Sequence, residues 1–334
     1  MIRAFAPGRV NLIGDHTDHQ GGLVLPIAID RGTTVTGKEG GDRVRLRSDD
    51  EEGRVEVRIG GGPPLTLGSQ WGRYVSAIVE LAQPARGFVG NVSTTLPLGA
   101  GLSSSAALEL AVALALGFEG SPLELAQLCQ RSEYLAVGVP CGIMDQLASA
   151  AGVADQALLI DCHDTSINPV PMPQGVDVLV VDSGQRRSLE GTAYNQRLVE
   201  CARAAEEVGP LRLLPEVEGI TDPVARRRAR HVVSEIARVR GFADALLAGN
   251  AQAAGELMVE SHESMKTDFE VSTPRLDAMV RDLAATPGIY GARLTGAGFG
   301  GSVVALAARG AALPDGAIRV RASAGARVTS ENGD

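Results

Sequence analysis

Hydrophobic and charged residues alternate along the first part of the chain. Arg43–Arg47 and Arg54–Ile59 place Val, Leu or Ile between charged residues, which is the two-residue period of a strand with one face in water. Gly22–Ile29 is apolar and rich in branched side chains. These segments predict antiparallel strands, and the glycine and proline run Gly60–Pro64 is expected to interrupt the chain after them.

Farther along, apolar residues recur at helical spacing. One face of a predicted helix would carry Trp71, Tyr74, Val75, Ile78 and Leu81. The pattern returns to that of a strand over Phe88–Thr95. Ser103–Phe118 predicts a helix that follows a glycine turn and opens with hydroxyl residues suited to an N-cap, and Leu123–Val137 predicts another.

The second half of the chain mixes both periods. Residues 161–173 contain three prolines and are expected to form a loop near a domain boundary, with an N-terminal domain over residues 1–165 and a C-terminal domain over residues 166–334. Beyond it we expect strands at Val176–Asp182, Gly291–Leu294 and Val303–Ala307, and helices at Thr192–Val208, Ala225–Arg240, Ala243–Leu247, Ala251–His262 and Thr273–Ala285. The prediction is a mixed α/β (α+β) enzyme of two domains without internal repeats.

Charge and composition narrow the function. The 334 residues are 44% hydrophobic and 21% charged, as in ordinary globular proteins, and the net charge of −9 argues against a nucleic-acid partner. Lys38 and Lys266 are the sole lysines, and neither follows a glycine-rich loop. A Walker-type phosphate site, which needs Gly-Lys-Ser or Gly-Lys-Thr, is therefore excluded.

The chain carries no pattern expected of an exported or membrane protein. The four cysteines (Cys129, Cys141, Cys162 and Cys201) lack Cys-x-x-Cys spacing, and no charged-then-apolar segment precedes Ala6–Gly8. The longest apolar stretch, Ala106–Phe118, carries Glu109 and is shorter than the roughly 20 residues of a membrane span. We expect a cytoplasmic protein that does not enter membranes.

A first motif, Gly8–Asp18, gathers polar groups behind a short apolar run. Asp15, His16 and Asp18 follow Asn11–Gly14 at a spacing suited to binding several hydroxyl groups of a small polyol. One histidine and two carboxylates could also bind a metal ion, which is the competing interpretation.

A second motif, Pro97–Ala106, is rich in glycine and serine and opens the predicted helix. Free backbone N–H groups at a helix start can bind phosphate without lysine. The predicted nucleotide-binding residues here are Pro97, Gly99, Gly101, Leu102, Ser103, Ser104 and Ser105. The alternative is a glycine turn and serine cap that bind no ligand. A hydroxyl of Ser104 or Ser105, with the Glu133 carboxylate, could also ligate Mg²⁺.

Arg9 and Asp145 are the candidate pair for the chemistry. An arginine beside a carboxylate keeps it ionised and can stabilise a phosphoryl group in transfer, while the carboxylate accepts a proton from the attacking hydroxyl. Taken singly, Asp145 could be a helix cap and Arg9 a surface charge.

With a third motif, Leu294–Gly301, the chain resembles the galactokinase family of the GHMP kinase superfamily. Further matches are Cys141–Gln146, Tyr194–Arg197, Arg228–Val232 and Glu256–His262. The resemblance implies ATP- and Mg²⁺-dependent phosphorylation of α-D-galactose at its C1 hydroxyl, by a monomer or homodimer with its site between two domains. It assigns catalysis to Arg9 and Asp145, sugar binding to Asp15, His16, Asp18, Gly142 and Tyr194, ATP phosphates to the glycine-serine loop of the second motif, and adenine to Trp71 and Tyr74. The predicted metal ligands remain Ser105 and Glu133, on the donor chemistry given above.

The chain departs from the family pattern at three positions. Asp15 and His19 stand where the family usually has Glu and Tyr, and Ala297 stands where it has Gly. Asp15, with its shorter side chain, and His19 motivate a second hypothesis, an anomeric kinase for another sugar such as N-acetylgalactosamine, arabinose or glucuronate. A non-catalytic sensor that binds sugar and ATP is the third. For Trp71 and Tyr74, plain core packing is the alternative to adenine binding.

Overall fold

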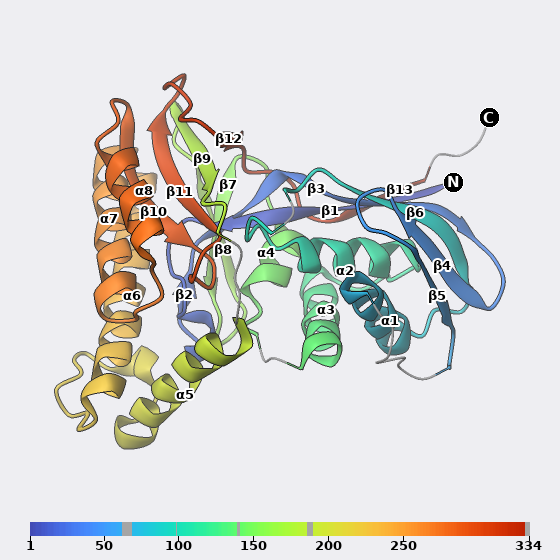
Figure 1. Ribbon diagram of the computed structural model, residues 1–334, viewed down its shortest axis with the longest axis horizontal. Coiled ribbons are helices and arrows are strands. Elements are labelled where there is room, and N and C mark those ends of the chain that lie inside the picture. The colour runs from blue at the N-terminus through green and yellow to red at the C-terminus, as the bar shows by residue number, and fades with distance from the viewer. Residues whose placement is uncertain (62–68, 98, 139–140, 186–189, 331–334) are drawn as a thin grey trace.

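A six-stranded sheet forms one end of the molecule (Figure 1). The computed structural model describes residues 1–61, 69–97, 99–138, 141–185 and 190–330. The order β13–β1–β3–β6–β4–β5 is antiparallel except between β4 and β6. Val44 and Leu46 are buried between exposed or half-exposed arginines, which confirms the predicted alternation. The strands are β1 (Ile2–Asn11), β3 (Pro26–Glu39), β4 (Arg43–Ser48), β5 (Arg54–Arg58), β6 (Phe88–Thr94) and β13 (Arg327–Ser330).

Helices cover one face of this sheet (Figure 1). They are α1 (Gln70–Ala82), α2 (Ser104–Ala115), α3 (Pro122–Val137) and α4 (Met144–Ala151). α2 and α4 pack against β1 and β3, and α1 and α3 pack on those helices. The first three confirm the predicted helices. The sequence did not predict α4, which is eight residues long and has small side chains over its second half, Ala148–Ala151.

A small sheet of three strands has the order β2–β7–β8. Its strands are β2 (Leu23–Val24), β7 (Gln156–Asp161) and β8 (Ile167–Pro171). The expectation of a loop over residues 161–173 is wrong for β8, because β8 lies at a sheet edge, where Pro169 and Pro171 need not donate ladder hydrogen bonds. The boundary after residue 165 stays a prediction, and the β7–β8 and β1–β13 pairings both cross it.

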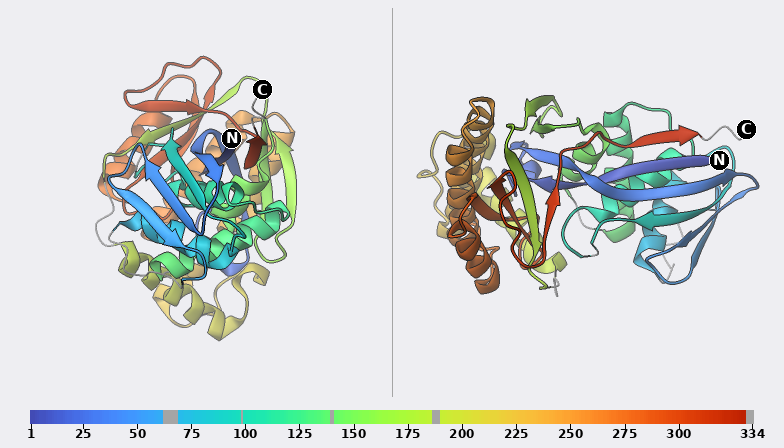
Figure 2. Two further views of the ribbon diagram at one scale, coloured as in Figure 1. Left: turned by 90° about the vertical axis from the view of Figure 1, so that its right-hand side faces the viewer. Right: turned by 90° about the horizontal axis from the view of Figure 1, so that it is seen from above.

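The other half of the molecule is an antiparallel sheet backed by long helices (Figures 1 and 2). The sheet order is β10–β11–β9–β12, from β9 (Val176–Asp182), β10 (Ile289–Thr295), β11 (Ser302–Ala308) and β12 (Ala317–Val320). The helices are α5 (Glu190–Val208), α6 (Pro223–Leu247), α7 (Ala251–Thr267) and α8 (Pro274–Ala284), with short 3₁₀ turns at Asp18–Gln20 and Leu211–Leu213. α7 and α8 pack on β10, and α6 packs on α7.

The helices predicted at 225–240 and 243–247 are one 25-residue helix, α6. Pro223 occupies the first turn, and the Asp222 carboxylate accepts hydrogen bonds from the N–H groups of Val224 and Ala225. Gly241 lies inside the helix without breaking it. None of the helices in the described ranges is long and apolar enough to cross a membrane.

A buried apolar cluster joins the two halves. Val10 and Ile27, from strands of the first sheet, belong to the same cluster as Phe242 of α6, Met258 of α7 and Val304 of β11. All five side chains are fully buried. Because well-packed interiors resist deformation, this cluster holds the two walls of the cavity described next in a fixed relation.

Candidate active site

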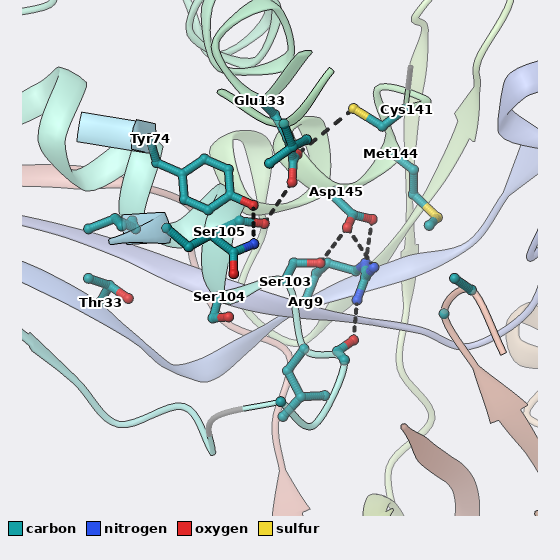
Figure 3. Close-up of a pocket in the computed structure, with 18 of the residues that line it drawn as sticks. Arg9, Thr33, Tyr74, Ser103, Ser104, Ser105, Glu133, Cys141, Met144 and Asp145 are labelled. Carbon is teal, nitrogen blue, oxygen red and sulfur yellow. Dashed lines mark hydrogen bonds and ion pairs between the residues drawn. The ribbon is translucent and has the colours of Figure 1, made fainter. Parts of the chain in front are cut away.

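One cavity of about 750 Å³ brings the three sequence motifs together (Figure 3). Its walls come from both halves of the chain, including Gly296–Phe299 of the third motif. Pro97 is not among its lining residues. The predicted site residues that line it are Arg9, Asp15, His16, Asp18, Trp71, Tyr74, Gly99, Gly101, Leu102, Ser103, Ser104, Ser105, Glu133, Gly142, Asp145 and Tyr194.

Arg9 and Asp145 form a two-pronged ion pair inside the cavity (Figure 3). The Nε and Nη2 atoms of Arg9 lie 2.7 Å from Oδ1 and Oδ2 of Asp145. The Arg9 side chain is 6% exposed and the Asp145 side chain 30% exposed, so the carboxylate is open to a ligand. The structure thus rejects the alternative that Arg9 is a surface charge.

An irregularity in β1 places Arg9 against the glycine-serine loop. The register of β1 on β3 shifts between Pro7 and Arg9, and such bulges re-aim side chains. The Arg9 N–H donates to the Leu102 carbonyl at 3.2 Å, and Arg9 Nη1 donates to the Gly101 carbonyl at 2.9 Å. A side chain on Gly8 would lie 2.6 Å from the Leu102 carbonyl oxygen, so this approach requires glycine.

The turn before α2 leaves the first N–H groups of that helix uncapped by a side chain. Gly99, Gly101 and Ser103 all have positive φ, which aims the chain into the helix. Ser103 occupies the N-cap position as expected, but its hydroxyl donates to Asp145 Oδ2 at 2.6 Å and does not cap the helix. The helix start therefore faces the cavity with donors suited to an anion.

Ser105 and Glu133 form a second polar cluster beside the Arg9–Asp145 pair (Figure 3). The Ser105 hydroxyl donates to Glu133 Oε1 at 2.8 Å, and Gln146 Nε2 donates to Oε2 at 2.5 Å. Burial and the nearby Asp145 charge raise the pKa of Glu133. A carboxylate and a hydroxyl in a partly open cavity are hard oxygen donors, and together with phosphate oxygens and water they fit Mg²⁺.

Asp18, Gly142, His16 and Tyr194 lie together in the cavity. A methyl group on Gly142 would stand 1.7 Å from Asp18 Oδ2, so the carboxylate occupies the space that a side chain at 142 would need. The His16 ring lies 4.5 Å from the Phe269 ring and 6.0 Å from the Tyr194 ring, centre to centre. This group combines a carboxylate, an imidazole and a phenol, which are suitable partners for sugar hydroxyls.

Asp15 lies deeper and contacts the second half of the chain. It is 2% exposed, Oδ1 accepts the Gly296 N–H at 2.9 Å, and Arg293 Nη2 lies 2.6 Å from Oδ2. Burial raises the pKa of Asp15, against the opposing effect of Arg293 and Arg9. In the described part of the chain no group of three His, Cys, Asp or Glu side chains could hold a metal ion, so Asp15, His16 and Asp18 do not form the metal site considered from the sequence.

Trp71 and Tyr74 pack in the core, as the alternative interpretation expected, and they also lie in the cavity wall. They are 6% and 8% exposed and belong to the core cluster of the first half. Burial, with the Glu133 charge, raises the pKa of Tyr74 to about 12, so its hydroxyl stays neutral.

Several lining residues had no signal in the sequence. They are Thr33 of β3, Thr94 of β6, Ser48 at the end of β4, and Asp50 two residues after that strand. They belong to segments with ordinary strand patterns, and strand pairing brings them together only in the folded chain. Arg293 and Glu235 were missed for the same reason, since their partners lie far away in sequence.

The fold and the site define a GHMP-type small-molecule kinase: the family model of the GHMP kinase N-terminal domain matches residues 73–153, and that of the C-terminal domain matches residues 242–322. The galactokinase galactose-binding signature matches residues 2–39. The chain belongs to the galactokinase family. It is 42% identical to galactokinases of Chloroflexus aggregans and Canis lupus familiaris, over 91% and 90% of this chain and 83% and 82% of theirs.

A solved structure agrees with this assignment. The galactokinase of Lactococcus lactis, determined with galactose, is 30% identical and superimposes with a TM-score of 0.90 over 98% of this chain and 95% of that one. The predicted mixed α/β kinase fold is therefore confirmed.

Proposed function

We propose that this enzyme transfers the γ-phosphoryl group of ATP to the C1 hydroxyl of α-D-galactose, giving galactose 1-phosphate and ADP. The observation that carries the proposal is the Arg9–Asp145 pair beside the uncapped start of α2. Both lie in a cavity that Asp15, His16 and Asp18 of the first motif also line. The galactose-binding signature over residues 2–39 supports galactose as the acceptor.

Asp145 orients the attacking hydroxyl and accepts its proton. Oδ2 already receives hydrogen bonds from Arg9 and Ser103, whereas Oδ1 receives one from Arg9 and keeps acceptor capacity. The C1 oxygen attacks the γ-phosphorus, the bond to the bridging oxygen of ADP breaks, and the proton moves to Asp145. Arg9 stabilises the negative charge that spreads over the transferring group.

The start of α2 binds the phosphates of ATP. Backbone N–H groups of the glycine-serine loop offer donors, and the positive end of the helix dipole adds attraction for the anion. Ser105 and Glu133 would hold Mg²⁺, which when bound neutralises phosphate charge. Trp71 and Tyr74 contact the adenine base from α1.

His16, Asp18 and Tyr194 bind the sugar hydroxyls, with Gly142 providing room for the Asp18 carboxylate. The cytoplasmic location and the monomeric or dimeric state remain predictions.

The test is ADP release by purified protein with Mg-ATP and a panel of galactose, glucose, N-acetylgalactosamine, arabinose and glucuronate. Asp145→Asn keeps the size of the side chain but removes its basic oxygen, so kcat with galactose should fall by about 10² to 10⁴-fold. Asp177→Asn, on β9 and paired with Arg319 away from the cavity, is the matched control. A near-normal kcat for Asp145→Asn would remove Asp145 from the chemistry.

A second candidate, a kinase for another sugar, follows from Asp15, whose carboxylate contacts Arg293 and Gly296. The same panel decides between the two, because galactose must give the highest kcat/KM if the first proposal is correct. Galactose-dependent ADP formation would also exclude the sensor hypothesis, which predicts binding of both ligands without turnover.

A further inference from the structure

Arg293 is a fully buried cation at the end of β10, immediately before the third motif. Its Nη2 atom lies 2.6 Å from Asp15 Oδ2 and 3.7 Å from Glu235 Oε1. Burying three charged groups costs several kcal/mol per ion unless they compensate one another. A cluster of this kind is retained where it fixes an arrangement that apolar packing alone would not specify.

The cluster and its neighbours hold the backbone of the first motif at Gly14 and Asp15. Glu235 of α6 accepts the Gly14 N–H at 2.9 Å and the Ser261 hydroxyl at 2.6 Å. Asp15 Oδ1 accepts the Gly296 N–H at 2.9 Å, and the Asp15 carbonyl lies 3.1 Å from His231 Nε2. The loop at residues 14–15 is thus attached to α6 and to Gly296 just after β10, and Glu235 links it in turn to Ser261 of α7.

Asp15 is held chiefly by the protein. Its side chain is 2% exposed, Oδ1 accepts the Gly296 N–H, and Oδ2 lies in the ion pair with Arg293. The next residue, His16, lines the cavity with φ +67°, in the left-handed region that a non-glycine residue adopts only when its surroundings hold it there. Asp18 follows, with its carboxylate against Gly142.

We propose that Arg293 is a positioning residue for the part of the cavity lined by Asp15, His16 and Asp18, and that it acts through its ion pair with Asp15, which fixes the loop that carries these residues. This inference rests on the proposed galactokinase function. The ion pair connects the first motif, which carries the proposed sugar-binding residues, to the segment before the third motif. The proposed nucleotide-binding residues lie on α1 and in the loop before α2 and take no part in this ion pair. The ion pair therefore sets the affinity for the sugar and leaves that for ATP unchanged.

The test is a double-mutant cycle with Arg293→Met, Asp15→Asn and the double variant. We expect each single variant to raise KM for galactose about tenfold or more, with KM for ATP within about twofold of the wild type. If Arg293 acts through Asp15, the double variant is no worse than the worse single variant. Multiplication of the two effects, or an equal rise in KM for ATP, would overturn the proposal.

Arg319→Met is the matched control. Arg319 pairs with Asp177 at 2.8 Å on β12, at the opposite edge of the same sheet, and does not line the cavity. Its galactose KM should stay within about twofold of the wild type. If Arg293→Met does not fold, Arg293→Lys replaces it in the cycle with the same expectation of non-additivity.

Amide hydrogen exchange gives a readout that does not depend on turnover. We expect residues 14–18 to exchange at least about tenfold faster in the Arg293 variant than in the wild type, and to be unchanged in Arg319→Met. Unchanged exchange at residues 14–18 would overturn the positioning role even if no sugar is phosphorylated. If the wild type does not phosphorylate galactose but residues 14–18 exchange faster in the Arg293 variant, the proposed function is contradicted and the positioning role of Arg293 is not.

Discussion

At the scale of single residues, Gly142 shows how closely the part of the cavity around Asp18 is packed. Gly142→Ala would place a methyl group 1.7 Å from Asp18 Oδ2, so the carboxylate must move. We expect KM for galactose to rise about tenfold or more while KM for ATP stays the same, measured by steady-state kinetics.

The control for this change is Gly241→Ala. Gly241 lies inside α6, where a methyl group would meet only Leu257 at 3.4 Å. This substitution should leave both KM values unaltered and stabilise the helix by about 0.5–1 kcal/mol. Equal galactose KM values for the two variants would contradict the importance of the space at Gly142.

His231 makes the stability of the protein depend on pH. It is buried between the Ser264 hydroxyl and the Asp15 carbonyl, and burial lowers its pKa from 6.5 to about 4. Since a carbonyl only accepts, Nε2 carries the proton and Nδ1 accepts from Ser264. The unfolded chain takes up a proton near pH 6.5 and the folded chain near pH 4, so this contribution is complete above pH 6.5 and is lost as the pH falls toward 4.

Urea unfolding at pH 7.5 and 5.0 measures this effect. We expect the wild type to lose more unfolding free energy over this interval than His231→Gln, by about 2 kcal/mol. The comparison cancels the contributions of other groups that titrate in both proteins. An identical pH dependence in the two proteins would show that His231 does not carry the effect.

At the scale of elements, the start of α2 combines strain with function. Ser103 has φ +57°, which favours glycine, and its hydroxyl bonds to Asp145 and does not cap the helix. Ser103→Gly and Ser103→Ala both remove the hydroxyl, but glycine also removes the strain. Thermal or urea unfolding should find the glycine variant about 1 kcal/mol more stable than the alanine variant.

The kinetic result should not follow this stability order. Both variants lose the hydrogen bond to Asp145, so kcat should fall in both by a similar factor of about tenfold. A wild-type kcat in either variant would mean that the Ser103 hydroxyl does not support the carboxylate.

Elements with a regular period were predictable from the sequence. The charged-apolar alternation of β4 and β5 and the helical spacing of α1 and α3 hold in the structure. β8 was missed because its prolines indicate a loop unless the strand is known to lie at an edge. α6 was divided at Gly241 because the sequence does not show the packing that keeps the helix continuous.

The site was predictable where one short motif carries it. The predicted site residues of the first two motifs meet in one cavity, apart from Pro97, which does not line it. Contacts between distant segments were not predictable, because no local pattern links Arg293 to Asp15, or Glu235 to Gly14, 221 residues apart in sequence. The sequence therefore indicated groups that line the cavity and missed the groups that hold them in place.

At the scale of the whole molecule, the shared core should make the two halves unfold together. Phe242 is fully buried in the cluster that joins N-terminal strands to α6, α7 and β11. Phe242→Ala should lower the unfolding free energy by about 3–5 kcal/mol. Val259→Ala, at a 40% exposed position on α7, should change it by less than about 0.5 kcal/mol.

Calorimetry measures both variants and the number of transitions. We expect a single cooperative transition for the wild type, because neither half can lose its share of this core alone. Two well-separated transitions in the wild type would contradict the joint core.

The pairing of β1 with β13 also bears on how the chain is made. Arg3 and Thr329 lie on adjacent strands but are 326 residues apart in sequence. At roughly 5–20 residues per second, the ribosome takes on the order of 15–65 s to supply the outer neighbour of β1. Until then one edge of β1 has unpaired N–H and C=O groups that can join strands of other nascent chains, so slower translation would lengthen the period in which aggregation competes with folding.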